Sequence, residues 1–438
     1  MTTRPVLYSW RAHPGAPAPG LPWQPLSDDL YWESSKRAPD RRLLFAPAPD
    51  WADDLQRVAR AVFAADRCTS RNATFDRWTR HIRLSVPVTA PGAWARALPH
   101  LTKLLTTVTG DRWEVEFRPF DADRTRSGPL TFDTEEYARE VSLFSGGLDS
   151  LGWAAQRATT ISSGALLLVT FQERNFEALQ DSVYEAVLGQ SKRPLRRLEQ
   201  SQTVRKPKGA TFELERSTRS RGLLYATAAV HAAAAERVPV VHIPENGQLA
   251  LNPPLSAARA GSCSTRSVHP WTLYHLNRVV AEITDTPDVA LRVVNPFASL
   301  TKGGVCAMAR DAGLPQEVLE ATLSCGTPPA RQGNQARLAH CGLCFPCLIR
   351  RSGLLFAYGE DRTPYASDPW DPHLDKKRTR RWRALQHWLD TPCTVLDLLA
   401  DTPLPSDAQP AELLAVVERG REELRVLVES AARWRRAA

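Results

Sequence analysis

Apolar and polar residues alternate with two different periods in the first third of the chain. Strand-like runs occur at 41–49, 79–88 and 111–119, and amphipathic helices are predicted at 50–65 and 93–108. The proline-rich leader that precedes them has no clear period. We therefore expect a small α+β module over residues 1–138, which ends in the polar stretch 120–137 with its Gly-Pro pair.

Between residues 139 and 360, short apolar runs alternate with helical patterns. The predicted strands are 140–144, 164–171, 239–245 and 290–297, and the helices between them are 175–189, 221–238 and 271–284. This alternation is typical of βαβ units and of a doubly wound, mostly parallel sheet. Residues 361–438 have the pattern of a helical extension, with helices at 375–389 and 410–436.

Composition narrows the class of protein only a little. The 438 residues carry a formal net charge of +8, but arginine bias in an alanine- and proline-rich chain is weak evidence for nucleic-acid binding. The N-terminus lacks the apolar core of a signal peptide, and no apolar run reaches the roughly 18 residues that a membrane span needs. We expect a soluble, cytoplasmic protein with no membrane partner.

The segment VSLFSGGLDS, residues 141–150, joins an apolar strand to a helix through two adjacent glycines. A strand that ends at Phe144 brings the chain to the edge of a parallel sheet where ligands bind. Gly146 and Gly147 carry no side-chain bulk, so backbone N–H groups can approach an anion, and the start of the following helix favours phosphate. The turn is neither a Walker A loop nor a Gly-x-Gly-x-x-Gly loop. The alternative is an ordinary tight turn in which Asp149 or Ser150 caps the helix.

Four of the eight cysteines are clustered, and in a cytoplasmic chain they are not expected to form disulfides. Fifteen residues separate Cys325 from Cys341, which opens the Cys-x2-Cys-x2-Cys run of Cys341, Cys344 and Cys347. Four thiolates at this spacing can close a structural zinc site. The spacing also permits an iron–sulfur cluster or four ordinary buried cysteines. We expect His340 to be a solvated neighbour of the cluster and not a ligand.

The sequence SGGLDS at 145–150 resembles the PP-loop of ATP pyrophosphatases. Together with the cysteine cluster, it is similar to the 7-cyano-7-deazaguanine synthase family, QueC. Residues 221–235 resemble the Arg-Asn-x-x-Phe helix of that family, residues 295–314 its Thr-Lys segment, and CGLCFPCLIRR at 341–351 its zinc knuckle. The resemblance covers about residues 140–357 and implies a PP-loop (HUP-like) fold.

The resemblance also implies an activity. In the family, the carboxylate of 7-carboxy-7-deazaguanine attacks the α-phosphate of ATP, pyrophosphate leaves, and an amine attacks the acyl adenylate. Mg²⁺ would accompany the ATP, and Zn²⁺ would be structural. Catalytic roles fall to Asp149, Arg221 and Lys302, and the ATP-binding residues are Phe144, Ser145, Gly146, Gly147, Leu148, Asp149 and Ser150.

Two segments of the family pattern are not recognisable. TFQERNFE, residues 170–177, replaces a Tyr-Gly-Gln-x-His stretch, and a segment that begins IPENGQ at residue 243 replaces an Asp-Cys-Arg-Pro region. In the second segment, Glu245 and Asn246 follow a predicted strand, and we expect them to bind substrate.

The added N-terminal module and the Glu-Asn-Gly segment resemble the QueC-like branch of bacterial antiphage defence operons, to which QatC belongs. That branch implies a protein partner from the same operon as the amine acceptor. The synthase of queuosine biosynthesis, with ammonia as the amine, is the alternative, and a homodimer is left open.

Each of these residues also has a purely structural interpretation. Lys302 can cap or solvate a helix start, Arg221 can belong to a surface ion pair, and the Glu-Asn pair can form a turn. His231 is expected to be a packed histidine, and residues 376–385 a solvated helix face or a nucleic-acid patch. Two further functions remain open, a tRNA-modifying PP-loop enzyme and a non-catalytic nucleotide-binding scaffold.

Overall fold

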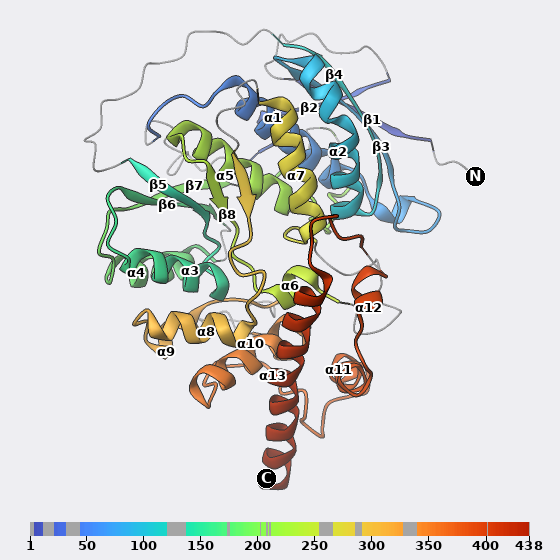
Figure 1. The fold of residues 1–438 in the computed structure, drawn as a ribbon. Helices are drawn as coiled ribbons and strands as arrows, with labels where there is room; N and C mark the ends of the chain where they lie inside the picture. Colours follow the sequence, from blue (N-terminus) through green and yellow to red (C-terminus); the bar gives the residue numbers. More distant parts are fainter. Residues whose placement is uncertain are drawn as a thin grey trace.

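The chain folds into a mixed α/β structure with two all-parallel sheets. The computed structural model describes residues 4–11, 22–31, 44–120, 137–172, 176–201, 203–206, 209, 212–253, 266–284, 291–326, 340–400 and 402–437. Figure 1 shows the N-terminal sheet and the central sheet on opposite sides of a helical layer, with the C-terminal helices below.

The N-terminal sheet has the strand order β2-β1-β3-β4. Its strands are β1 (Val6–Arg11), β2 (Gln24–Ser27), β3 (His81–Val88) and β4 (Arg112–Pro119). The helices α1 (Asp50–Cys68) and α2 (Pro91–Thr109) connect its later strands. Because every pairing is parallel, this part is built from βαβ units and is not the α+β module that we expected.

Two further expectations for this part are wrong. Residues 44–49 form no strand, although the run 41–49 was predicted as one; residues 41–43 lie outside the described residues. The proline-rich leader, in turn, supplies β1 and β2. Strand β1 pairs with β2 on one side and with β3 on the other, and it buries Tyr8 and Trp10, which a short, proline-flanked apolar run does not reveal.

The central sheet has the strand order β7-β6-β5-β8-β9. Its strands are β5 (Ala138–Leu143), β6 (Ala165–Gln172), β7 (Leu195–Ser201), β8 (Val240–His242) and β9 (Arg292–Val294). Four of these five strands, and the parallel arrangement of this sheet, were predicted. The edge strand β7 was missed because Arg196 and Arg197 interrupt its apolar pattern; these side chains pair with Glu236 and Asp181.

Helices cover both faces of the central sheet. The four that connect its strands are α3 (Leu148–Thr159), α4 (Glu177–Leu188), α5 (Arg221–Glu236) and α7 (Pro270–Ile283). The remaining helices are α6 (Gly247–Leu251), α8 (Lys302–Asp311), α9 (Gln316–Ala321), α10 (Phe345–Tyr358), α11 (Arg380–Asp390), α12 (Val395–Leu399) and α13 (Pro410–Ala437).

One hydrophobic core runs across the boundary between the two sheets. Helix α1 packs on α5 and α2 packs on α7, so two helices from each part form the layer between the sheets. The buried residues of this core come from the N-terminal sheet, from these four helices and from one face of the central sheet. The other face of the central sheet packs on α3, α4 and α8 in a second core.

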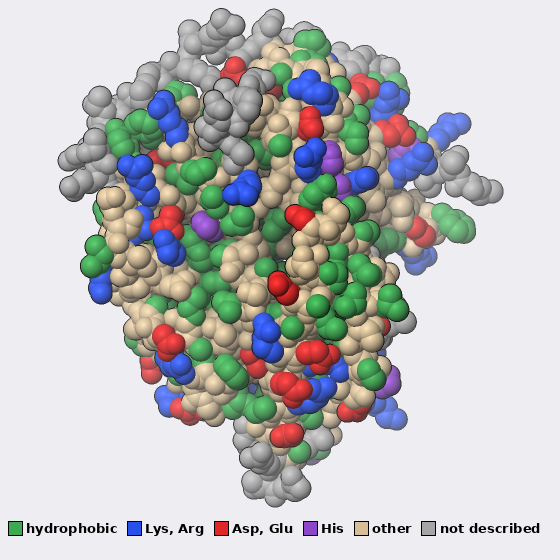
Figure 2. Space-filling view, in the orientation of Figure 1, with side chains coloured by type: hydrophobic (Ala, Val, Ile, Leu, Met, Phe, Trp, Pro, Cys, Tyr) green, Lys and Arg blue, Asp and Glu red, His purple; other side chains and the backbone are tan. Residues whose placement is uncertain are grey.

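No described helix is both long enough and apolar enough to cross a bilayer. In the face drawn in Figure 2, basic and acidic side chains are interspersed and do not gather into one basic patch. The residues 376–385, expected as a solvated helix face, are mostly exposed, although Trp382 and Leu385 are buried.

A buried ion network links the N-terminal part to the central part. The Arg80 guanidinium lies 2.5 Å from carboxylate oxygens of both Asp66 and Asp111. Asp111 also accepts two hydrogen bonds from Arg71, each 3.0 Å long. The second Asp66 oxygen accepts a hydrogen bond of 3.1 Å from the backbone N–H of Ser220, directly before α5. The network therefore fixes the start of α5 from the N-terminal sheet.

Replacement of Asp111 by Ala should destabilise the fold by about 3–5 kcal/mol, because it removes the carboxylate that pairs with the buried Arg71 and one of the two that pair with Arg80. Glu114→Ala on β4, the strand that follows Asp111, is the control. Its carboxylate is 44% exposed and pairs with His81, so its loss should cost no more than about 1 kcal/mol. Denaturant unfolding measures both, and equal costs for the two variants would contradict the assigned role of the network.

Candidate functional site

The candidate site lies where the strand order of the central sheet reverses. Strands β6 and β7 lie on one side of β5, and β8 and β9 lie on the other. In open parallel sheets, ligands bind at the carboxyl ends of the two strands that flank such a point. Here β5 leads into the glycine loop at 144–147, and β8 leads into Glu245 and Asn246. The two predicted binding segments therefore lie at one edge of the sheet.

The conformation of the glycine loop is fixed by hydrogen bonds between its own residues and the start of α3. Gly146 has a φ of +74°, a conformation that glycine adopts without strain. The Ser145 hydroxyl accepts a hydrogen bond from the N–H of Gly147 and lies 3.2 Å from the Ser150 hydroxyl. Ser145 is exposed, and no side chain caps the start of α3. The first N–H groups of α3 thus have no intrahelical acceptor, and they follow a loop in which Ser145 is exposed while Phe144 and Gly146 are buried.

Gln180 supports this loop from α4 and was not predicted. Its side-chain amide donates hydrogen bonds of 3.0 Å to the carbonyl oxygens of both Ser145 and Phe171. A Cβ on Gly146 would lie 3.1 Å from the Gln180 side chain, so the loop and this side chain are in close contact. A glutamine that follows a strand and stands on a helix has no sequence signal for such a role.

Asp149 and Lys302 form a buried ion pair. The Lys302 ammonium donates to Asp149 Oδ2, and the two residues are only 1% and 8% exposed. The interpretation of Lys302 as a solvated or capping residue is therefore wrong. The cap of α8 is Thr301, whose hydroxyl accepts a hydrogen bond from the N–H of Gly304. A paired ammonium is the form in which a lysine tolerates burial.

Two mid-helix glycines allow this ion pair to form. A Cβ on Gly152 would lie 3.0 Å from Val305, which shows that α3 and α8 pack closely one turn away from Asp149 and Lys302. A Cβ on Gly353 of α10 would lie 2.6 Å from the Lys302 side chain. Glycine within a helix costs stability, so these two positions are a signal that the sequence offered.

Glu245 and Asn246 complete a cluster of four residues. The Asn246 amide donates to Asp149 Oδ2 at 3.3 Å and to Glu245 Oε1 at 2.9 Å, and Asn246 itself is fully buried. The side-chain oxygen of Asn246, Oδ1, accepts a hydrogen bond from the N–H of Leu249 and so caps α6. Asn246 is therefore a turn residue and also a member of the cluster.

The cluster brings two carboxyl groups to one ammonium. Burial, and after it the nearby Asp149 carboxylate, raises the pKa of Glu245 well above its ordinary value. Burial opposes the charge of Lys302, but Asp149 and Glu245 outweigh it and raise the lysine pKa. The Asp149 Oδ1 atom is buried and has no hydrogen-bond partner among the described residues. A cation or a donor from a ligand would satisfy this oxygen.

Arg221 stands apart from this cluster. It is the first residue of α5, and because α5 runs antiparallel to the strands, its start lies at the same edge of the sheet. Its guanidinium lies 5.8 Å from the ring centroid of Tyr225, which stacks on Phe171 at the end of β6. The structure thus places Arg221 at the correct edge, next to the strand that flanks the glycine loop.

The four clustered cysteines could hold one metal ion. Their sulfur atoms all lie within 4.8 Å of one another, and Cys325 and Cys341 lie 3.9 Å from Cys344 and Cys347, respectively. Four ligands at the usual Zn–S distance are about 3.8 Å apart. These distances suit one central ion and are too short to enclose a cluster of several iron and sulfide atoms.

Backbone N–H groups orient the sulfur atoms. The N–H of Leu343 and that of Cys344 donate to the sulfur of Cys341, at 3.4 Å and 3.3 Å. Gly342 has a φ of +75°, and a Cβ there would lie 1.9 Å from the Ser367 carbonyl oxygen, so only glycine fits this turn. These contacts preorganise the turn for a structural metal such as zinc.

His340 is not the solvated neighbour that we expected. It is 3% exposed, and its Nε2 accepts a hydrogen bond of 3.2 Å from the N–H of Ser324. Ser324 lies between Cys325 and Leu323, whose carbonyl oxygen would lie 3.5 Å from a Cβ on Gly147. The cysteine cluster therefore fixes a segment that lies directly beside the glycine loop. His231 is packed as expected, with its Nε2 2.9 Å from Asp53.

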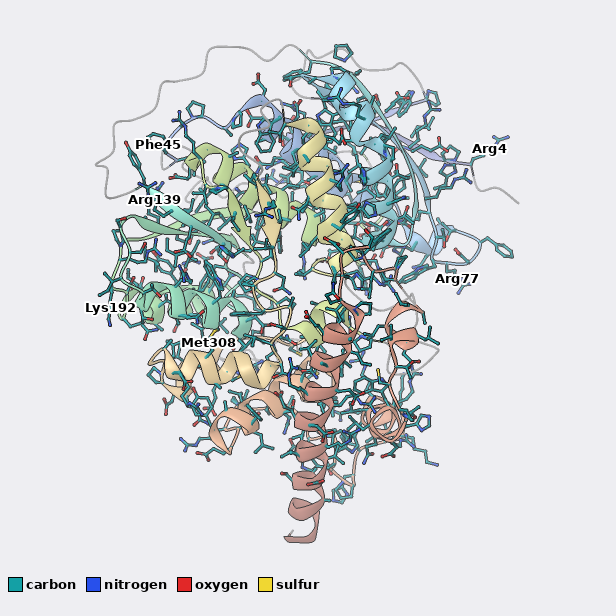
Figure 3. The ribbon with its side chains drawn as sticks, in the orientation of Figure 1. Arg4, Phe45, Arg77, Arg139, Lys192 and Met308 are labelled. Atoms are coloured by element: carbon teal, nitrogen blue, oxygen red, sulfur yellow. The ribbon has the colours of Figure 1, made fainter. Side chains whose placement is uncertain are left out.

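A separate hollow of about 750 Å³ lies along α3 and does not include the four-residue cluster. Its lining includes Glu140, Arg157 and His242. Figure 3 labels two more of its residues, Arg139 at the start of β5 and Met308 on α8. The candidate site is therefore defined by its side chains and its loop.

Comparison with known proteins adds no relative. No protein-family model matches the chain, and no curated protein matches it. The geometry described above is consequently the main support for a function.

Replacement of Cys344 by Ser should remove the metal and destabilise the fold. We expect about one zinc per chain in the purified protein and well below half of that in the variant, together with a lower melting temperature. Cys393→Ser is the control, because Cys393 lies outside the cluster. Metal analysis and thermal unfolding are the measurements, and full zinc retention in the Cys344 variant would contradict the site.

Glu245→Gln should stabilise the ligand-free protein at neutral pH. Because the pKa of Glu245 is raised by folding, the folded state loses stability as pH rises above the ordinary glutamate value, by about 1.4 kcal/mol for each pKa unit. The variant has no carboxyl group to titrate at this position. The difference in free energy of unfolding between the variant and the wild type should therefore grow in favour of the variant between pH 5 and pH 8.

Glu140→Gln provides a control whose effect on stability should not depend on pH in this range. Burial opposes the charge of Glu140, but hydrogen bonds from Arg157 and Arg193 hold its pKa below the ordinary value. Glu140 is therefore ionised in both the folded and the unfolded state above about pH 5, so the stability difference between this variant and the wild type should stay constant between pH 5 and pH 8. Denaturant unfolding across this range tests both, and two curves with the same slope would contradict the assignment.

Proposed function

We propose that this chain is an ATP-dependent enzyme of QueC-like type, which adenylates a carboxylate and releases pyrophosphate. The observation that carries the proposal is the meeting of the glycine loop with Asp149, Lys302, Glu245 and Asn246 where the strand order reverses. The resemblance of residues 145–150 to a PP-loop supports the same function.

The loop and the start of α3 bind the departing pyrophosphate. Free N–H groups at a helix start and in a glycine turn are the usual donors to phosphate oxygens. Lys302 supplies positive charge beside Asp149 in the first turn of α3, where burial strengthens its interaction with an anion. Arg221, at the same edge, is placed to bind phosphate oxygens that reach β6.

The carboxyl pair fits a magnesium ion. Asp149 and Glu245 belong to the same buried cluster, and Asp149 Oδ1 has no hydrogen-bond partner among the described residues. Carboxylate oxygens together with phosphate oxygens are the ligands that Mg²⁺ prefers. When bound, the ion would neutralise charge on the triphosphate. Asn246 holds both carboxyl groups in place through its amide.

The substrate class rests on the resemblance to QueC. We propose a 7-carboxy-7-deazaguanine-type carboxylate as the group that attacks the α-phosphate. The amine that then attacks the acyl adenylate is ammonia or an amine of a protein partner. The bond to pyrophosphate breaks as the acyl–phosphate bond forms, and AMP leaves when the amide forms.

Pyrophosphate release from Mg·ATP should require 7-carboxy-7-deazaguanine. Asp149→Asn should reduce the rate of release at least about 100-fold, because the variant loses the carboxylate that pairs with Lys302 and would bind Mg²⁺. Asp311→Asn on α8 is the control; its carboxylate is 69% exposed and should not affect the rate. A coupled pyrophosphate assay measures the rates, and mass spectrometry of the products identifies the amine.

Three outcomes would contradict the proposal in different ways. Binding of ATP without any pyrophosphate release would favour a scaffold. Release that depends on tRNA and falls steeply with salt would favour a tRNA-modifying enzyme. Equal activity of the Asp149 and Asp311 variants would contradict the assignment of the active site to the cluster around Asp149.

A further inference from the structure

The C-terminal helix α13 reaches the segments that carry the candidate site, although it lies outside the part of the chain that resembles QueC. It packs against α6, which follows Asn246, and against α8, which begins at Lys302. Gly420 of α13 approaches Gln248 of α6 so closely that a Cβ would lie 1.9 Å from its side chain. A Cβ on Gly247 would lie 3.0 Å from Val416. Helix α13 therefore packs directly against the two helices, α6 and α8, that begin at or next to site residues.

Glu423 is the residue of α13 that contacts the start of α8. Its Oε2 accepts a hydrogen bond of 3.0 Å from the N–H of Gly303, and its Oε1 accepts one from the Thr301 hydroxyl. A Cβ on Gly303 would lie 2.4 Å from the Glu423 carboxylate, so the glycine leaves room for the carboxylate. The residues on both sides of Lys302 are thus bound to one buried carboxylate.

We propose that Glu423 is a positioning residue of the nucleotide site, which fixes the first turn of α8 so that Lys302 stays beside Asp149. A carboxylate at a helix start satisfies free N–H groups and interacts favourably with the helix dipole. The side chain of Lys302 donates to Asp149, while Glu423 accepts from the residues directly before and after it, Thr301 and Gly303. This inference rests on the proposed function, because it gives Lys302 the task of binding phosphate.

The charge of Glu423 provides a readout. Burial raises its pKa to about 7, against the hydrogen bonds from Thr301 and Gly303. The charged and titratable groups that act on it are Lys302 and Cys306 of α8 and Arg419 of α13. The carboxylate and the neutral form are therefore about equally populated near pH 7, and the carboxylate form grows above that pH and is lost below it.

The test measures the dissociation constant for Mg·ATP and the rate of pyrophosphate release in full-length variants. Glu423→Ala should weaken binding or turnover by about 10-fold to 100-fold, since it removes two hydrogen bonds to a charged group. Glu423→Gln preserves the shape and should lose less, and its activity should no longer fall between pH 8 and pH 6. Glu422→Ala is the matched control, because Glu422 is exposed and pairs only with Arg425 among the described residues.

A double-mutant cycle separates positioning from general stability. If Glu423 acts through Lys302, then Glu423→Ala should have little further effect on Mg·ATP binding in a Lys302→Met background. Additive losses, or a Glu423→Gln variant with the wild-type pH profile, would overturn the inference while leaving the proposed function intact. A wild-type protein that neither binds Mg·ATP nor releases pyrophosphate would overturn the proposed function itself.

Discussion

The buried ion pair between Lys302 and Asp149 is the constraint on which the rest of the site depends. Removing two charges from water costs several kcal/mol for each, and only close partners offset that cost. Here the partners come from three separate segments, namely the start of α3, the start of α8 and the loop after β8. A shift of any one segment would leave a buried charge uncompensated. The geometry of the site is therefore enforced by the stability of the fold.

This constraint explains why glycines occur inside the helices around the pair. Gly152 brings α3 onto α8, Gly353 leaves space for the Lys302 side chain, and Gly303 admits Glu423. Each of these glycines costs helix stability, by about 1 kcal/mol relative to alanine. The fold retains them because a Cβ at these positions would clash with Val305, Lys302 and Glu423, respectively, and would push α3, α10 or α13 away from α8.

The sequence predicted the parts of the site whose signals are local. An apolar strand, two glycines and a helix pattern are adjacent in the chain, so the loop at 144–147 and the parallel central sheet could be expected. Glu245 and Asn246 were found because polar residues after a buried strand gather at one sheet edge. Glu423 could not be found in this way, because it lies 120 residues after Gly303 in a run of charged helical residues that resembles a solvated face. Only the packing of α13 shows its partner.

The same reasoning links the cysteine cluster to the site through α10. Cys344 caps this helix and Cys347 lies in its first turn, so a metal ion would fix how the helix begins. Two turns further on, Gly353 of the same helix lies against Lys302. Since α10 also packs on α13, the cluster and the C-terminal helix support α8 from two directions. Loss of the metal should therefore change the orientation of α10 and, through Gly353, the position of Lys302. This effect is expected even though no cysteine belongs to the four-residue cluster.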